Sequence, residues 1–188
     1  MLERLARVCL RLVGWRVVGK RPDVPKMVIT AYPHTSNWDF AIYLLSAWAL
    51  GIPLAWMGKD ALFRGPAGVV LRRLGGIGIR RDRNENVVAQ MKRTFAERDE
   101  LCLLIPVEGT RSHVPYLKSG FYHIAFTAGV PIAVSFMDYR RKESGIASLV
   151  EPTGDICADM DRLRNFFDSG AGLYPERAGE VRLREEDA

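Results

Sequence analysis

Residues 101–105 read Leu-Cys-Leu-Leu-Ile, a continuous apolar run with no polar position in it. A strand with one face in water alternates apolar and polar residues, whereas a strand buried on both faces is apolar throughout. The run therefore predicts a strand inside a parallel sheet that helices cover on both faces. Similar runs predict strands at residues 27–31, 54–57, 77–79 and 130–136, and residues 146–150 are a weaker candidate.

Segments with helical periodicity separate these strands. Asn86 to Glu97 is amphipathic, and its apolar face carries Val87, Val88, Met91, Thr94 and Phe95. Helices are also predicted from Gly65-Pro66 through Leu71, at residues 121–128 before Gly129, and at residues 159–167. Because strands and helices alternate without a repeat or a linker, we predict one α/β domain over residues 1–188, a mainly parallel sheet flanked by helices.

The longest stretch without charge runs from Phe40 to Met57 and is eighteen residues long, so a membrane span must be considered. Gly51 and Pro53 divide the stretch, which leaves a helix of about a dozen residues and a strand from Leu54. We therefore predict a buried helix followed by a buried strand. A surface that faces a membrane or an acyl chain is the alternative.

The two ends of the chain are rich in charge. Residues 1–21 predict a basic amphipathic helix, from Leu2 to about Val18, with Leu2, Leu5, Cys9, Leu12 and Val13 at helical spacing and Arg4, Arg7 and Arg11 away from that stripe. Such a helix suits the interface of an anionic membrane, or it covers the core with its arginines in water. After Gly170 the charged residues predict a weakly ordered tail over 170–188, in which Val181-Arg182-Leu183 could pair as an edge strand.

Composition narrows the classes of partner. The net charge of +5 favours anionic partners, although it also serves solubility. Three distant cysteines, Cys9, Cys102 and Cys157, argue against a zinc site or a disulfide framework and for a reducing compartment. Neither a cleavable leader nor a nucleic-acid motif is recognised. We expect a cytoplasmic protein at the cytoplasmic membrane face, held there peripherally by the N-terminal helix, without metal or nucleic acid.

Polar side chains follow three of the predicted strands. His34 and Asp39 follow the first, Arg80 and Arg81 follow the strand at 77–79, and Glu108, Thr110, Arg111 and Ser112 follow the strand at 101–105. The carboxyl ends of parallel strands meet at one edge of a sheet, where ligands bind. A histidine can act as a base, and arginine forks match phosphate oxygens. The pattern suggests removal of a proton from a hydroxyl of a phosphorylated substrate.

His34-x4-Asp39 together with Glu108-Gly109-Thr110-Arg111 resembles the glycerolipid acyltransferases of the lysophosphatidate type, in a compact branch. Lys118-x-Gly120 and Gly129-Val130-Pro131-Ile132 extend the likeness, which covers residues 29–134. Such enzymes move an acyl group from acyl-CoA or acyl carrier protein to a hydroxyl of a phosphorylated glycerol. The resemblance implies no other cofactor.

By that resemblance His34 is the base and Asp39 its orienting partner. The substrate-binding set would comprise Arg80, Arg81, Glu108, Gly109, Thr110, Arg111 and Lys118, with Glu108 ordering the motif around it. Two positions depart from the family pattern, because Val107 stands where Pro is usual and Pro33 where many members have Asn. These departures leave the acceptor open.

Three alternatives stay beside this interpretation. Ser36 or Ser112 could form a serine hydrolase site with His34, although neither lies in G-x-S-x-G. A basic lipid-binding module without catalysis would use the arginines but would give no reason for the histidine motif. Arg111 could form a structural ion pair with Glu108, and Arg80 and Arg81 could belong to a solvated charge cluster.

Overall fold

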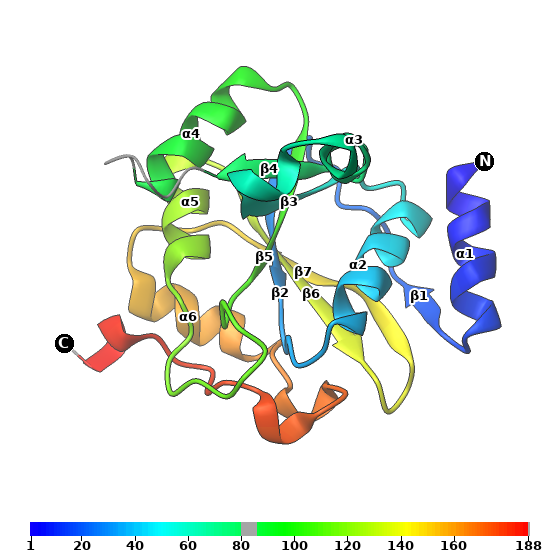
Figure 1. Cartoon of the computed structure of the whole chain (residues 1–188). Coiled ribbons are helices and arrows are strands. Elements are labelled where there is room, and N and C mark those ends of the chain that lie inside the picture. Colours follow the sequence, from blue (N-terminus) through cyan, green and yellow to red (C-terminus); the bar gives the residue numbers. More distant parts are fainter. Residues whose placement is uncertain (80–85, 188) are drawn as a thin grey trace.

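The computed structural model describes residues 1–79 and 86–187 and contains one sheet of seven strands flanked by helices (Figure 1). The strand order is β1-β7-β6-β2-β5-β3-β4. The pair β6–β7 is antiparallel and the other neighbouring pairs are parallel. The strands are β1 (Arg16–Val18), β2 (Lys26–Ala31), β3 (Leu54–Lys59), β4 (Gly76–Ile79), β5 (Leu101–Pro106), β6 (Ile132–Asp138) and β7 (Glu143–Val150). The predicted fold class is confirmed.

Helices cover the sheet on both faces (Figure 1). They are α1 (Leu2–Leu12), α2 (Trp38–Ala49), α3 (Pro66–Arg73), α4 (Val87–Glu97), α5 (Gly120–Ala128) and α6 (Ile156–Arg164), with short 3₁₀ turns η1 (Asp60–Phe63), η2 (Ser169–Ala171), η3 (Pro175–Arg177) and η4 (Arg184–Asp187). Helices α4, α5 and α6 enclose one apolar core, and α1 and α2 enclose the other. None of the described helices is long and apolar enough to span a membrane.

The central strand β5 serves both cores. Leu101, Leu103 and Ile105 point into the core under α4 and α5, whereas Cys102 and Leu104 point into the core under α2. Successive side chains of a strand face opposite sides, so a strand between two cores must be apolar at every position. This alternation explains the continuous apolar run in the sequence.

The N-terminal segment differs from the prediction. Helix α1 ends at Leu12 instead of Val18, because Gly14 turns the chain with φ +81° and residues Arg16–Val18 then pair with β7. The face of α1 that packs on the protein carries Ala6 and Leu10. The predicted stripe is mostly exposed, and its members Leu2, Leu5, Leu12 and Val13 face away from the core.

The C-terminal segment also differs. Helix α6 begins at Ile156, three residues earlier than predicted, because Asp155 caps it by accepting a hydrogen bond from the Ala158 N–H. After Gly170, where the charged residues predict a weakly ordered tail, three side chains are buried: Ala171, Ala178 and Leu183. The predicted edge strand at 181–183 is reduced to one bridge, between Leu183 and Leu117. Apolar burial therefore holds the tail against the body of the protein.

Candidate active site

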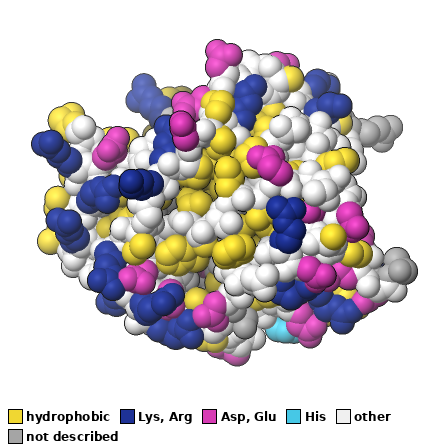
Figure 2. All heavy atoms as spheres, turned by 180° about the vertical axis from the view of Figure 1, so that it is seen from behind, with side chains coloured by type: hydrophobic (Ala, Val, Ile, Leu, Met, Phe, Trp, Pro, Cys, Tyr) yellow, Lys and Arg dark blue, Asp and Glu magenta, His cyan; other side chains and the backbone are white. Residues whose placement is uncertain are grey.

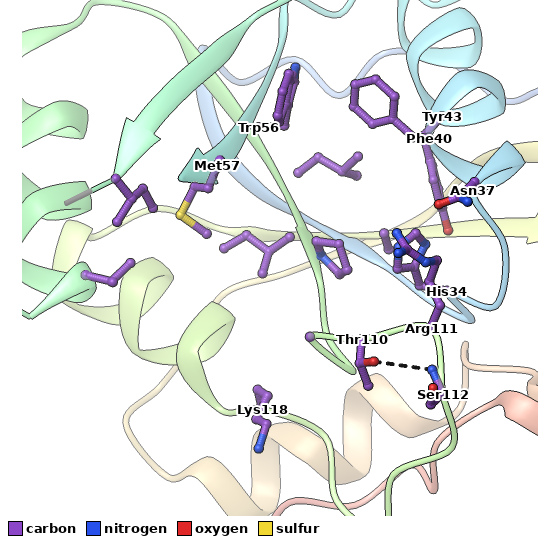
Figure 3. Close-up of a pocket in the computed structure, with 18 residues that line it drawn as sticks. His34, Asn37, Phe40, Tyr43, Trp56, Met57, Thr110, Arg111, Ser112 and Lys118 are labelled. Carbon is purple, nitrogen blue, oxygen red and sulfur yellow. Dashed lines mark hydrogen bonds between the residues drawn. The ribbon is translucent and has the colours of Figure 1, made fainter. Parts of the chain in front are cut away.

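A cleft of about 690 Å³ opens where β2, β3, β4 and β5 end (Figure 3). One part of its wall is polar and the other is apolar. The polar wall carries His34, Asn37, Thr110, Arg111, Ser112 and Lys118, and the apolar wall carries Phe40, Trp56, Met57, Ile79, Val87 and Leu104. His34 lies between the two parts in the close-up view (Figure 3). The predicted meeting of polar residues at one sheet edge is thus confirmed for the loops after β2 and β5.

His34 and Asp39 form a pair at the start of α2. The His34 Nδ1 atom lies 3.1 Å from Asp39 Oδ2. A carboxylate accepts hydrogen bonds, so Nδ1 carries the hydrogen and Nε2 keeps its lone pair. The side chain of His34 is 14% exposed and lines the cleft. This geometry leaves Nε2 free to take a proton from a bound molecule.

The Asp39 carboxylate is fully buried, at 0% exposure. Besides His34, its Oδ2 accepts hydrogen bonds from the backbone N–H groups of Thr35 at 2.8 Å and Ser36 at 2.9 Å. The side chain of Asn37, at the N-cap position of α2, makes no capping hydrogen bond. Asp39 therefore orders the loop that carries His34.

Glu108 connects the two sequence motifs. Its carboxylate is 1% exposed and accepts the His34 backbone N–H at 3.0 Å and 3.2 Å. Burial raises the pKa of Glu108, and the bond from His34 offsets part of that rise. The carboxylate lies behind the His34 loop and not in the lining of the cleft. The resemblance placed Glu108 among the substrate-binding residues and also gave it a role in ordering the motif. Its position behind the His34 loop suits the ordering role.

The loop after β5 brings cations to the cleft. Gly109 turns with φ +69°, and a side chain there would crowd Lys118 Cγ at 3.3 Å. Arg111 and Lys118 line the cleft, and both are exposed. Neither has a carboxylate within ion-pair distance in the described part of the chain, so the structural pair between Arg111 and Glu108 is not formed. Two cations without an acidic partner make this wall suited to an anion.

The remaining predicted site residues divide into two groups. Thr110 lines the cleft, and its Oγ1 accepts a hydrogen bond from the Ser112 N–H at 3.4 Å (Figure 3). Arg80 and Arg81 lie outside the described residues, so their roles stay predictions. Ile79, the residue before them, lines the cleft.

The serine hydrolase alternative finds no geometry in its favour. The Ser36 hydroxyl accepts a hydrogen bond from the Trp38 N–H at 3.2 Å. Neither the Ser36 nor the Ser112 hydroxyl is hydrogen-bonded to the His34 ring. Residues 1–79 and 86–187 contain no group of three or more His, Cys, Asp or Glu side chains placed to hold a metal ion.

Sequence reasoning missed Tyr139, the residue directly after β6. Its hydroxyl donates a hydrogen bond to Asp39 Oδ1 at 2.8 Å. Burial and the neighbouring Asp39 carboxylate raise the pKa of Tyr139, so the hydroxyl stays protonated as a donor. Tyr139 is a hundred residues from Asp39. The pairing of β6 with β2 brings Tyr139 to Asp39, and the periodicity of the sequence does not reveal that pairing.

Comparisons with known proteins identify the family and the fold. The family model described as Acyltransferase matches residues 16–136, well over half of the chain. The crystal structure of the 1-acyl-sn-glycerophosphate (LPA) acyltransferase PlsC from Thermotoga maritima matches with a TM-score of 0.60 and 16% sequence identity, over 87% of this chain and 76% of that chain. At that identity the match concerns the fold. No curated protein matches the chain.

Proposed function

The chain belongs to the acyltransferase family, and on this premise we propose that it transfers a fatty acyl group from a thioester donor to a hydroxyl of a phosphorylated glycerolipid. The donor would be acyl-CoA or acyl carrier protein, and the acceptor a lysophospholipid or a glycerol phosphate. The observation that carries the proposal is the pair of His34 and Asp39, which borders a cleft with apolar side chains on one side and, on the other, cations that no described carboxylate pairs with. That combination suits a molecule with a hydroxyl, a phosphate and a hydrocarbon chain.

The proposed mechanism needs a single base. Nε2 of neutral His34 takes the proton of the acceptor hydroxyl while its oxygen attacks the thioester carbonyl. Asp39 stabilises the imidazolium that forms. The tetrahedral intermediate collapses, the carbon–sulfur bond breaks, and the leaving thiolate takes the proton from the imidazolium. An ester and a free thiol result, without an acyl-enzyme.

Substrate orientation follows from the two walls of the cleft. Arg111 and Lys118 would hold the acceptor phosphate, because guanidinium and ammonium groups form strong, charge-assisted hydrogen bonds with phosphate oxygens. Phe40, Trp56 and Met57 would hold an acyl chain by excluding water from it. Glu108 would fix the position of the His34 loop beside the cleft by accepting a hydrogen bond from the His34 backbone N–H.

Peripheral membrane contact is the second part of the proposal. The exposed side of α1 carries Leu2, Leu5, Val8 and Leu12, and Leu12 is 82% exposed. Hydrophobic and basic side chains lie together along the edge of the molecule that α1 forms (Figure 2). An amphipathic helix with arginines beside an apolar face suits an anionic lipid surface. Contact there would bring the cleft to a lipid acceptor.

Release of free thiol tests the enzymatic proposal. The substrates are acyl-CoA and acyl carrier protein donors with lysophosphatidate, glycerol 3-phosphate or a non-phosphorylated alcohol as acceptor. We expect acceptor-dependent release by the wild type and a loss of at least about 100-fold in His34→Ala. His123→Ala, which removes an exposed histidine from α5, is the matched control and should keep full activity.

The other outcomes have distinct meanings. Thiol release without acceptor would indicate a thioesterase. Full activity in folded His34→Ala would refute the mechanism. Absence of release with every donor and acceptor pair would refute the proposed substrates and would favour a lipid-binding module.

A further inference from the structure

We propose that Tyr139 is a positioning residue of this site, whose hydroxyl holds Asp39 in place and, through Asp39, keeps His34 Nε2 directed at the cleft. The inference deepens the proposed function and rests on it. Tyr139 does not line the cleft, so it would act only through Asp39. It also lies beyond the segment 16–136 that the family model matches.

The two oxygens of Asp39 have different numbers of partners. Oδ2 receives three hydrogen bonds, from the His34 ring and from the backbone of Thr35 and Ser36. Oδ1 receives one, from the Tyr139 hydroxyl, and no other described residue donates to it. The carboxylate is 0% exposed, so an oxygen that loses its donor there has no bulk water to replace it. Tyr139 thus completes a carboxylate that would otherwise be half satisfied.

Tyr139 is itself held by elements far apart in the sequence. Its ring packs edge-on against buried Trp15 at a centroid distance of 4.9 Å. Its backbone N–H donates to the carbonyl of Ala171 in η2 at 2.9 Å. The hydroxyl therefore has a fixed position from which to restrain Asp39, since both the ring and the backbone are anchored.

Other groups around Asp39 do not duplicate this role. Tyr43 of α2 lies near the carboxylate, but its hydroxyl donates to the Tyr32 carbonyl at 3.4 Å. Glu108, after β5, accepts hydrogen bonds and cannot donate to Asp39 while ionised. The titratable groups that face the His34–Asp39 pair are therefore Glu108, Tyr43 and Tyr139, with Tyr174 next to Tyr139. Among the described residues, Tyr139 alone supplies a side-chain hydroxyl to Asp39.

Tyr139→Phe tests the inference, because it removes the hydroxyl and keeps the ring. We expect kcat to fall about tenfold, since a hydrogen bond to a charged group is lost, while the KM of each substrate stays within about twofold. The matched control is Tyr122→Phe, which removes a more deeply buried tyrosine hydroxyl that donates to the carboxylate of Asp159, 2.9 Å away on α6. That variant should retain the wild-type kcat.

A second readout needs no substrate. Diethyl pyrocarbonate modifies neutral imidazole, and peptide mass spectrometry follows each histidine separately. Loss of the Tyr139 hydroxyl leaves more negative charge on Asp39, which favours the imidazolium of His34. The modification of His34 should therefore begin at higher pH in Tyr139→Phe than in the wild type. Exposed His113 and His123 are internal standards and should not change.

The outcomes separate the two proposals. If the wild type transfers no acyl group, the proposed function fails, while the pH of His34 modification still decides the role of Tyr139. If folded Tyr139→Phe keeps both the wild-type kcat and the wild-type modification profile, the inference is refuted. It is also refuted if Tyr122→Phe loses as much activity as Tyr139→Phe, because the loss would then reflect general destabilisation.

Discussion

Asp39→Asn isolates the charge of the buried carboxylate while preserving its shape. Asp39 accepts four hydrogen bonds, from His34, Thr35, Ser36 and Tyr139. A hydrogen bond to a charged group contributes about 1 kcal/mol more than a neutral one, so four such bonds set an upper limit of roughly 4 kcal/mol. Relief of the desolvation cost of a buried charge offsets part of this loss. We expect the free energy of unfolding to fall by about 1–3 kcal/mol.

The effect on catalysis should be larger than the effect on stability. The asparagine cannot stabilise an imidazolium as a carboxylate does, so kcat should fall on the order of 100-fold to 10,000-fold. Urea unfolding gives the stability change and thiol release gives the rate. Both are measured on the same preparation, at a temperature where the variant is folded.

Asp159→Asn is the matched control for this prediction. Asp159 is 1% exposed and also has four donors, from Tyr122, Arg162 and twice from Thr153, but it lies at the start of α6. It should lose similar stability and keep its transfer rate. Transfer by folded Asp39→Asn within a few fold of the wild type would refute the reasoning, as would an equal loss in Asp159→Asn.

Three further predictions concern other parts of the molecule. Arg111→Ala should raise the KM for a phosphorylated acceptor about tenfold or more and leave a non-phosphorylated alcohol unaffected, as steady-state kinetics would show; an equal rise for both acceptors would argue against a phosphate contact. Burial raises the pKa of Asp138, but hydrogen bonds from Arg140 and Arg141 outweigh that effect and lower the pKa to about 2. The ionised Asp138 carboxylate therefore stabilises the fold above its ordinary pKa, and this stability is lost as the pH falls towards 2. Asp138→Asn should be less stable than the wild type at pH 7, and the difference between their urea midpoints should shrink below about pH 4. Leu12→Glu should reduce sedimentation with anionic vesicles without changing the unfolding temperature, because Leu12 is 82% exposed; unchanged sedimentation would remove α1 as a lipid contact.

Local pattern was sufficient for most of the sheet. A strand between two cores is apolar at every position, so β2, β5 and β6 were predictable from uninterrupted apolar runs. The convergence of the His34 and Glu108 motifs was predictable for a related reason, since parallel strands place their carboxyl ends at one edge. The sequence also shows the residue types of the site. A histidine has a carboxylate five positions after it, and cations follow a buried strand in the chain.

Other features depended on which surfaces met. Helix α1 has two apolar stripes, and periodicity alone does not say which one packs; small Ala6 with Leu10 packs on the protein, and the wider stripe of leucines faces out. The tail after Gly170 looked too charged to pack, yet three spaced apolar residues, Ala171, Ala178 and Leu183, anchor it. In both cases the segment packs on a surface formed by residues that are distant in sequence, so local pattern does not predict the packing.

The sequence by itself therefore determined the fold class and the residue types that gather at the candidate site, because apolar runs and residue types are local properties of the chain. Only the tertiary structure placed Glu108 behind the His34 backbone and Tyr139 against Asp39. These contacts join residues 74 and 100 positions apart, and no local pattern records them. A buried carboxylate takes whichever donors the packed elements bring to it, and that choice is made when the strands pair.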